Sequence, residues 1–288
     1  MNEGNLMEQR VAIVTGGLRG LGRAMALGLA KAGHRVAAVG HIEADIPELN
    51  AAAAEQQLRD RVWPLVADLR KPEECDRIVA EIRARFGSLD ILVNNAGLTF
   101  TYIDPARFRR PTIQRFWEVP DEIVENVIVT NYLAGDRLSR RVAPAMVAQG
   151  CGRIVNVTTK LDTMNRVGTH PYGASKAALE MATEVWAKDV EGTGLTINIV
   201  NPGAGANTPG MADEMRQMSR EGRAARLVEP EEMVPPLLYV VSREADRVNG
   251  MRFDANAWDA ALAPAEAARL AGRPAGFVLH PQAPPSAG

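Results

Sequence analysis

A glycine-rich segment between an expected strand and an expected helix constrains the fold of this chain more than any other feature. Residues 10–15 are β-branched and almost continuously apolar, as is typical of a strand that helices cover on both faces. They lead into Thr15-Gly16-Gly17-Leu18-Arg19-Gly20-Leu21-Gly22 and then into a helix that Gly33 is placed to end. Glycines in such a turn let a diphosphate approach the backbone, and the free amides of the following helix favour an anion. The spacing differs from Gly-x-Gly-x-x-Gly, so a plain tight connection is the alternative to a dinucleotide site.

The rest of the chain alternates strand and helix patterns, which favours an α/β fold with a mainly parallel sheet. Further strands are expected at residues 35–40, 62–66, 89–93, 152–159, 195–201 and 249–253. Further helices are expected at residues 51–60, 72–86, 120–149, 172–190 and 230–241. This pattern predicts one domain over residues 1–255 and a C-terminal extension over residues 256–288. The extension is expected to be partly disordered, because residues 274–288 are rich in proline, and Trp258 is expected to anchor it.

Composition excludes several classes of protein. A formal charge of -2 provides no field that would gather polyanions, so nucleic acid is not an expected partner. No run of about 18 apolar residues is present, and the N-terminus lacks a basic segment followed by an apolar one, so we expect no membrane association and no export. Cys75 and Cys151 have no Cys-x-x-Cys spacing and the four histidines are scattered, which argues against a zinc site. Two reduced cysteines fit a cytoplasmic protein.

Two further motifs follow the glycine turn in a fixed order. Asn94-Asn95-Ala96-Gly97 comes directly after the fourth expected strand, and Tyr172-Gly-Ala-Ser-Lys176 opens a later helix. With these three motifs, the chain over residues 8–255 resembles the short-chain dehydrogenase/reductase family. The resemblance implies a Rossmann-like, doubly wound fold with a mainly seven-stranded parallel sheet and helices on both faces. It also implies that the two asparagines brace the sheet beside the cofactor cleft.

The spacing of Tyr172 and Lys176 has a chemical use. Residues four apart on a helix share one face, so both side chains can approach a common point. Hydride transfer to a carbonyl needs a proton donor for the resulting alkoxide, yet a free tyrosine with a pKa of about 10 is a poor acid–base group near neutral pH. A neighbouring ammonium favours the phenolate, and we therefore expect Lys176 to lower the pKa of Tyr172.

The resemblance extends this pair to a set of four residues. Thr159 lies thirteen residues before Tyr172, and Asn131 lies twenty-eight residues before Thr159, intervals that match the family's Asn, Ser, Tyr, Lys tetrad. By resemblance, Tyr172 is the general acid/base, Lys176 also binds the nicotinamide ribose, and Asn131 holds a water in a proton relay. Thr159 replaces the usual serine, keeping the hydroxyl but adding a methyl group and a stiffer χ1. Asp162 stands where a glycine is common.

The end of the second strand bears on the choice of cofactor. Dinucleotide sites often place Asp or Glu there for the adenosine ribose, or a basic residue nearby for a 2′-phosphate. Here Gly40 occupies the acidic position, His41 follows it, and Arg19 lies within the glycine turn. The resemblance therefore implies NADP(H) over NAD(H). The alternative is that Arg19 is only solvated and Glu43 supplies the missing acid.

The remaining cofactor contacts follow from the resemblance. An aspartate after the third strand contacts the adenine ring in the family, although Asp68 also reads as a plain turn residue. The complete expected set is Gly16, Leu18, Arg19, Gly20, Leu21, Gly22, Gly40, His41, Asp68, Leu69, Asn95, Ala96, Gly97, Tyr172, Lys176, Pro202, Gly203 and Thr208.

Two segments are candidates for contact with the substrate. Residues 98–117 hold five aromatic residues and four arginines after the carboxyl end of a strand, which fits a pocket wall, a subunit contact or a solvated basic loop. Met211, Met215 and Met218 have the spacing of one helix face, which fits either a lid or ordinary packing. The arginines mildly favour an anionic or polar substrate.

These observations predict an NADP(H)-dependent oxidoreductase that acts on a secondary alcohol or ketone. The alternative is a cofactor-sensing or regulatory protein that kept the fold with little turnover, as the departures at Thr159 and Asp162 allow. Because Asn131, Tyr172 and Lys176 are all present, the enzyme is favoured. By resemblance we expect a homodimer or homotetramer that packs through the two long helices containing Asn131 and Tyr172.

Overall fold

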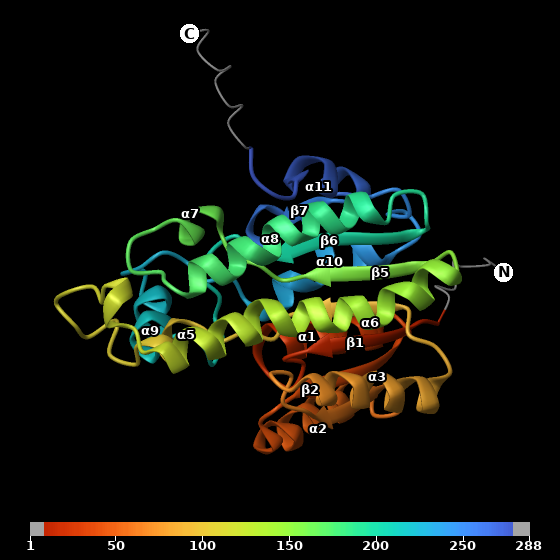
Figure 1. The fold of residues 1–288 in the computed structure, drawn as a ribbon, viewed down its shortest axis with the longest axis horizontal. Helices are drawn as coiled ribbons and strands as arrows, with labels where there is room; N and C mark the ends of the chain where they lie inside the picture. The colour runs from red at the N-terminus through yellow and green to blue at the C-terminus, as the bar shows by residue number, and fades with distance from the viewer. Residues whose placement is uncertain (1–8, 279–288) are drawn as a thin grey trace, which may run out of the picture.

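A central β-sheet lies between two layers of helices in the computed structural model, which describes residues 9–278 (Figure 1). The strands are β1 (Val11–Thr15), β2 (Arg35–Gly40), β3 (Val62–Val66), β4 (Ile91–Asn94), β5 (Gly152–Asn156), β6 (Leu195–Asn201), β7 (Met251–Asp254) and β8 (Gly272–Pro274). Their order across the sheet is β3-β2-β1-β4-β5-β6-β7-β8, and only the pair β7–β8 among these strands is antiparallel. The predicted doubly wound α/β fold is confirmed.

Helices cover both faces of the sheet, so β1, β4, β5 and β6 are buried on both sides. The helices are α1 (Gly20–Lys31), α2 (Ile46–Glu55), α3 (Pro72–Phe86), α4 (Phe100–Ile103), α5 (Asp121–Ile128), α6 (Ala134–Ala148), α7 (Leu161–Met164), α8 (Tyr172–Asp189), α9 (Asp213–Arg220), α10 (Val234–Val241) and α11 (Pro264–Ala271). Helices α1, α2, α10 and α11 pack on one face, and α3, α6 and α8 pack on the other. Figure 1 shows α6 and α8 crossing the near face of the sheet.

The order of the strands places the functional motifs. Strand β1 pairs with β2 on one side and with β4 on the other, so the direction of winding reverses between β1 and β4. Open α/β sheets bind ligands outside the carboxyl ends of the strands at such a reversal. The glycine turn after β1 and the Asn94–Gly97 segment after β4 therefore meet at one edge of the sheet.

The structure corrects the expectation that residues 249–253 form the last strand. Strand β8 pairs with β7, with Phe253 opposite Gly272 and Met251 opposite Pro274. The sheet therefore continues beyond residue 255 into the expected extension. No local sequence pattern predicts the pairing of β8 with β7. As predicted, Trp258 anchors this segment, since its ring lies 5.7 Å from Tyr239 and 6.1 Å from Phe253 between ring centroids. Residues 279–288 of the extension lie outside the described residues.

Two expected helices differ in their bounds. The helix expected at residues 51–60 is α2, which begins at Ile46 because Pro47 occupies its first turn, a position that suits proline. The helix expected over residues 120–149 is α5 followed by α6, joined by a π-helical turn, Val129–Leu133. Asn131 lies inside this turn. Wide turns of this kind occur often at functional sites.

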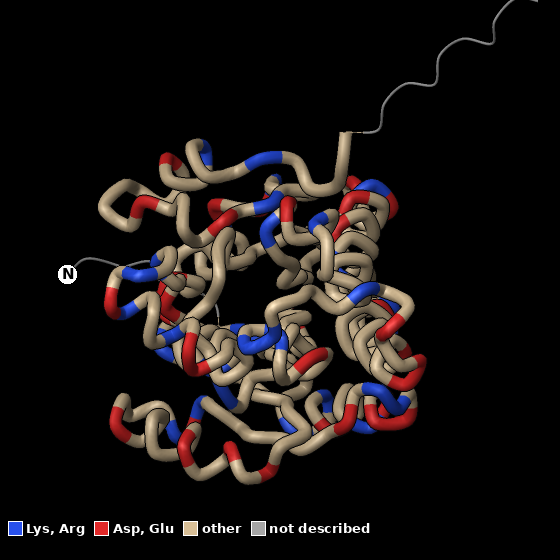
Figure 2. Tube along the Cα trace, turned by 90° about the vertical axis from the view of Figure 1, so that its left-hand side faces the viewer, with Lys and Arg blue, Asp and Glu red and all other residues tan. Residues whose placement is uncertain are grey.

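Charges of both signs are interspersed over the molecule. Figure 2 shows lysine and arginine positions alternating with aspartate and glutamate positions along most of the visible trace. Across residues 9–278 no helix combines the length and apolar character needed to cross a bilayer. In that same range no group of three or more histidine, cysteine, aspartate or glutamate side chains could hold a metal ion.

Candidate active site

The turn after β1 has the geometry that its glycines predict. Gly16 and Gly20 have φ of +64° and +56°, the left-handed region that L side chains rarely adopt. A Cβ on Gly22 would lie 2.1 Å from the carbonyl oxygen of Gly16, so the first turn of α1 packs directly on the loop. The backbone is therefore exposed at the start of α1, as the approach of a diphosphate requires.

Asn95 and Thr15 tie this turn to β4. The side-chain amide of Asn95 donates to the carbonyl of Thr15 at 2.8 Å, and the Thr15 hydroxyl accepts from the backbone amides of Asn95 and Ala96 at 2.9 and 3.0 Å. Asn94 donates to Asn156 on β5 at 2.8 Å. The two asparagines therefore brace neighbouring strands, the structural part that their motif implies.

A cleft begins at the glycine turn. Its first part is a cavity of about 200 Å³, lined by eleven of the residues expected at the cofactor: Gly16, Leu18, Arg19, Gly20, Leu21, Gly40, His41, Asn95, Ala96, Gly97 and Thr208. Its second part is a cavity of about 500 Å³ that shares Leu21, Asn95, Gly97, Thr99, Thr208 and Gly210 with the first. Thr159, Tyr172, Lys176 and Pro202 line this second cavity. One continuous cleft therefore joins the glycine turn to the tyrosine–lysine pair.

A polar atom in the wall of the cleft is also consistent with a bound dinucleotide. The hydroxyl of Thr130, which lines the first cavity, is a buried oxygen that forms no hydrogen bond within the described residues. Buried polar atoms are rarely left without a partner. A polar ligand in this cavity would supply that partner.

Four expected cofactor residues lie outside both cavities. Gly22 shapes the turn, and Gly203 (φ +72°) forms a bend in which its amide donates to Asn201 at 2.7 Å. Asp68 accepts two side-chain hydrogen bonds from Arg70, at 2.9 and 2.8 Å, and this hydrogen bonding lowers the pKa of the carboxyl group. This arrangement favours the plain turn aspartate over an adenine contact. Leu69 is buried and lines a separate small cavity.

The structure adds Asp45 to the adenosine end of the cleft. Its carboxylate lies 3.6 Å from Nε of Arg19, and both residues line the first cavity. Glu43, the acid considered from sequence, is exposed and is not part of that lining. Asp45 sits in a short 3-10 turn, Glu43–Asp45, that follows β2. The distance of Asp45 from Gly40 in the sequence could not identify it as a cleft residue, because the path of this turn depends on the folded structure.

The expected catalytic side chains converge from two places, the start of α8 and the segment after β5. Tyr172 begins α8, Lys176 follows one turn later, and Thr159 lies three residues beyond the end of β5. The Thr159 side chain hydrogen-bonds Tyr172. Nζ of Lys176 donates to the carbonyl of Val157 at 2.8 Å. The expected hydroxyl–phenol–ammonium arrangement is therefore assembled around the second cavity.

Burial sets the protonation of this group. Desolvation raises the pKa of Tyr172, and the hydrogen bond from Thr159 opposes this rise only in part. Burial also lowers the pKa of Lys176 from 10.5 to about 8. The expected lowering of the tyrosine pKa by Lys176 is therefore not what the protein alone provides. A buried ammonium loses its hydration, which weakens the cation that would favour the phenolate.

The titration of Lys176 leads to a prediction for stability. The folded state binds this proton less tightly than the unfolded chain does. The buried ammonium therefore lowers the free energy of unfolding by its full amount below pH 8, and this penalty disappears as the pH rises from 8 to 10.5. We expect the free energy of unfolding of Lys176→Met, relative to the native chain, to fall over this interval. Urea denaturation at a series of pH values measures it. Lys31→Met, at an exposed site, is the control, and parallel curves for the two variants would contradict the prediction.

Both polar atoms of the Asn131 side chain form hydrogen bonds with other described residues. Its Oδ1 accepts from the amide of Leu98 at 2.7 Å, and its Nδ2 donates to Leu98 O at 3.1 Å and to Ser175 Oγ at 3.0 Å. These bonds connect the π-helical turn to the loop after β4 and to α8. The amide therefore holds the three segments together, and the water relay stays a prediction.

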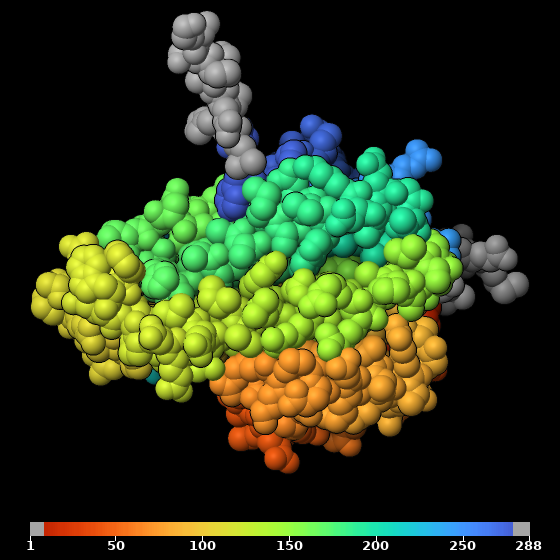
Figure 3. All heavy atoms as spheres, in the orientation of Figure 1, coloured from red at the N-terminus to blue at the C-terminus, as the bar shows by residue number. Residues whose placement is uncertain are grey.

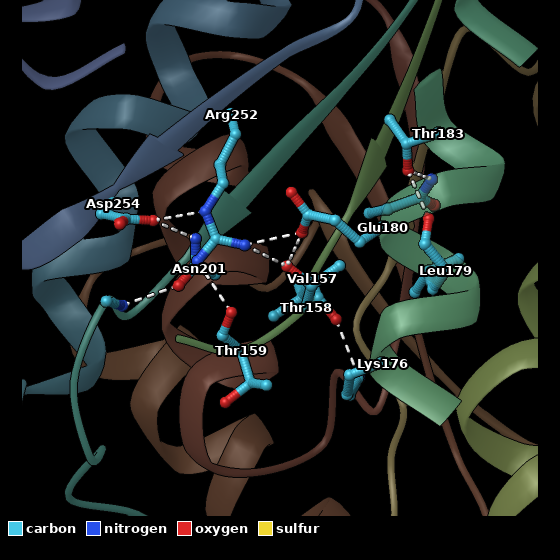
Figure 4. A network of polar contacts seen from close by, with 12 residues as sticks. Val157, Thr158, Thr159, Lys176, Leu179, Glu180, Thr183, Asn201, Arg252 and Asp254 are labelled. Carbon is cyan, nitrogen blue, oxygen red and sulfur yellow. Dashed lines mark hydrogen bonds and ion pairs between the residues drawn. The ribbon is translucent and has the colours of Figure 1, made fainter. Parts of the chain in front are cut away.

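A buried ion pair behind Thr159 was not expected from sequence. Arg252 on β7 donates to the carbonyl of Thr159 at 2.7 Å, to Thr158 Oγ1 at 2.9 Å and to Glu180 Oε2 at 2.6 Å (Figure 4). Its Nε donates to Asp254 at 2.9 Å. The side chains of Arg252 and Glu180 are both fully buried. The carbonyl of Thr159 is thus held by a side chain from β7, two strands away from β5 in the sheet.

The segment after β4 divides between two roles. Phe100, Arg107 and Phe108 line the second cavity, whereas Phe116 and Trp117 are 64% and 68% exposed. Figure 3 shows this yellow segment forming the protruding end of the molecule. Met211 and Met215 also line the cavity. The pocket-wall interpretation therefore applies to the first half of the segment. Of the three methionines, Met218 is outside the cavity lining and Met211 precedes α9, so the expected single helix face is not formed by all three.

Comparison with known proteins agrees with this geometry. The family model described as short chain dehydrogenase matches residues 10–219. The chain belongs to the short-chain dehydrogenase/reductase family. As a member of the family it is an oxidoreductase that uses a nicotinamide cofactor and acts on CH–OH or C=O groups.

Several relatives of this short-chain dehydrogenase span most of its length. The 3-oxoacyl-(acyl-carrier-protein) reductase FabG of Vibrio cholerae serotype O1 is 32% identical over 253 residues, covering 87% of this chain and 97% of that protein. Nodulation protein G of Azospirillum brasilense is 31% identical, covering 87% and 98%.

Two solved structures share the fold. A putative NAD(P)-dependent gluconate 5-dehydrogenase from Beutenbergia cavernae, with NADP bound at low occupancy, is 31% identical with a TM-score of 0.72, covering 88% of this chain and 97% of its own. A variant of actinorhodin polyketide ketoreductase with NADPH is 27% identical with a TM-score of 0.70, covering 84% and 93%.

Proposed function

We propose that this protein is an NADP(H)-dependent oxidoreductase that interconverts a ketone and a secondary alcohol. The observation that carries the proposal is the continuous cleft from the glycine turn to Tyr172. It gives an elongated dinucleotide a path that ends beside a proton donor. The activities named for two similar proteins, a 3-oxoacyl reductase and a ketoreductase, support carbonyl reduction.

The residues of this chain divide the chemistry between them. A nicotinamide bound in the cleft supplies the hydride that the carbonyl carbon takes up. Tyr172 gives its phenolic proton to the carbonyl oxygen as the alkoxide forms, and in the reverse direction the phenolate takes the proton back. Thr159 donates a hydrogen bond to the same oxygen and thereby orients the substrate. Lys176 provides a cation that stabilises the phenolate and a donor for the ribose of the cofactor.

The proposal of NADP(H) rests on Arg19 and on Gly40, which presents no carboxylate to a 2′-phosphate. Asp45 competes for Arg19, so the 2′-phosphate would have to displace this exposed ion pair, which is worth little. NADP and NADPH in the two solved structures support the choice.

Calorimetric titrations with NADPH and NADH test this choice. In Arg19→Ala we expect NADPH affinity to fall about tenfold, about 1.4 kcal/mol, because a charge-assisted contact is lost. Asp45→Asn should strengthen NADPH binding, since the competing carboxylate is gone. NADH affinity should be unchanged in Arg19→Ala. If the native chain prefers NADH and Asp45→Asn loses that preference, Asp45 binds the ribose and the proposal is wrong.

A cofactor sensor on the same fold is the alternative. Both functions predict binding of the cofactor, so turnover separates them: oxidation of NADPH with any member of a broad ketone panel supports the enzyme, and tight binding without turnover supports the sensor. We also propose a homo-oligomer packed through α5–α6 and α8. Val147 and Val185 on these helices are 37% and 48% exposed, which supports such a contact.

A further inference from the structure

The second cavity has an excess of positive charge. Over the part of the chain that the structure describes, its wall contains five cationic side chains and one acidic side chain, namely Arg107, Lys160, Arg166, Lys176, Arg226 and Asp162. The charge of the whole chain is close to neutral, at -2. The excess of positive charge is therefore local to this cavity, which is where the substrate must lie.

Three of the five cations already have partners. Nζ of Lys160 lies 3.1 Å from Asp162. Arg226 donates to both carboxylate oxygens of Glu232, at 2.7 and 2.8 Å. Lys176 is held against the carbonyl of Val157 in the catalytic group. Among residues 9–278, Arg107 and Arg166 form no ion pair with a carboxylate.

Arg107 is fixed in place inside the cavity. Its Nη1 donates to the carbonyl of Gly168, and its Cζ lies 4.2 Å from the centroid of the Phe100 ring. The Phe100 ring in turn lies 4.7 Å from the ring of Tyr172. Such stacking holds a guanidinium in a defined orientation and leaves further N–H donors for a planar anion. The guanidinium is therefore preorganised one ring away from the proton donor.

Arg166 is the second cation that lacks a partner. Within residues 9–278 its side chain has no hydrogen bond or ion pair, although its charge contributes to lowering the pKa of Asp162. Burial, together with the charge of Arg166, lowers the pKa of Arg107, while Asp104 opposes the shift and is itself 3.6 Å from Arg110. The two guanidiniums thus repel each other within one cavity. A bound anion would relieve that repulsion.

The lining also contains a group of apolar side chains. Phe100, Phe108, Met211, Met215 and Leu227 contribute to the same wall. Aromatic and thioether side chains accept varied apolar shapes. The cavity therefore combines apolar side chains with the guanidiniums of Arg107 and Arg166.

We propose that the substrate is a ketone, or the corresponding alcohol, with an apolar body and an anionic group that Arg107 and Arg166 bind. The inference rests on the proposed oxidoreductase function and assigns the class of its substrate. Carboxylate and phosphate share the chemistry that a guanidinium recognises. Either would place the reacting carbonyl at Tyr172 and the charge beyond Phe100.

Three aryl methyl ketones of different charge test the proposal: para-acetylbenzoate, its methyl ester and para-acetylphenyl phosphate. We expect a higher kcat/KM for the charged ketones than for the ester, and the better of the two identifies the preferred anion. In Arg166→Ala the KM of the charged ketones should rise roughly tenfold to a hundredfold with little change in kcat, as for one lost charge-assisted hydrogen bond. The ester should be unaffected. Arg166→Lys should restore part of the loss.

Arg109→Ala is the matched control, because Arg109 is an exposed arginine of the same segment that lies 3.8 Å from Glu214 and outside the cavity lining. Equal kcat/KM for the ester and the carboxylate, or equal losses for both in Arg166→Ala, would overturn the anionic site and leave the oxidoreductase proposal intact.

If none of the three ketones is reduced, titration with benzoate and phenyl phosphate tests the anion site separately from the reaction. Binding that weakens about tenfold in Arg166→Ala supports the site. Absent or unchanged binding refutes it.

Discussion

Tyr172→Phe is expected to lower kcat for ketone reduction by about 10²–10⁴-fold, the usual contribution of a positioned general acid. The change removes only the phenolic oxygen and keeps the ring that packs at 4.7 Å against Phe100. The cavity should therefore retain its shape, and NADPH affinity should change little. Loss of NADPH absorbance measures kcat, and calorimetry measures affinity for the cofactor.

Tyr239→Phe is the control for this substitution, because Tyr239 lies in the core cluster on the opposite side of the sheet from α8. It should leave kcat unchanged. If Tyr172→Phe keeps kcat within about threefold of the native value while the substrate is reduced, the acid has another source and the assignment of Tyr172 fails.

Arg252→Met is expected to lower the free energy of unfolding by about 3–5 kcal/mol, because it leaves the carboxylate of Glu180 buried without its cation. Arg273 lies 3.5 Å from the other oxygen of Glu180 and would compensate only in part. The substitution also frees the carbonyl of Thr159, so kcat should fall even where the variant is folded. Chemical denaturation and steady-state kinetics at low temperature measure the two effects.

The double variant Arg252→Met with Glu180→Gln separates the two effects. Removing both charges should recover part of the lost stability, since no carboxylate is left uncompensated beside Thr158. The loss in kcat should persist, because the donor to Thr159 is still absent. A single variant as stable as the native chain would show that the ion pair contributes nothing net. Full activity in the folded double variant would show that the Thr159 carbonyl needs no such donor.

Local patterns predicted most of the secondary structure. The continuous apolar run correctly predicted β1. The proline followed by an amphipathic repeat correctly predicted α3 with its bounds, Pro72–Phe86. Predictions were wrong where the controlling contact is distant in the chain. Strand β8 forms because it pairs with the edge strand β7. The three residues of β8 show no strand pattern in the sequence.

The candidate site follows the same division. The family resemblance pointed to Asn131, Thr159, Tyr172 and Lys176, and the structure brings the last three to one cavity and Asn131 next to them. Asp45 and the pair Glu180–Arg252 were not identified. The two members of that pair lie 72 residues apart on α8 and β7, and nothing in either local sequence indicates the other.

The sequence by itself determined the doubly wound fold, because strand and helix patterns depend on short-range periodicity, and it indicated the family through three motifs in a fixed order. The four expected catalytic positions follow from the resemblance to that family, together with the helical spacing of Tyr172 and Lys176. The tertiary structure alone decided three further properties. It set the protonation of Tyr172 and Lys176, because desolvation depends on what surrounds a group. It placed Asp45 beside Arg19, and it left Arg107 and Arg166 facing one cavity. Burial and electrostatics arise from residues far apart in the chain, and only the packed fold brings them within reach.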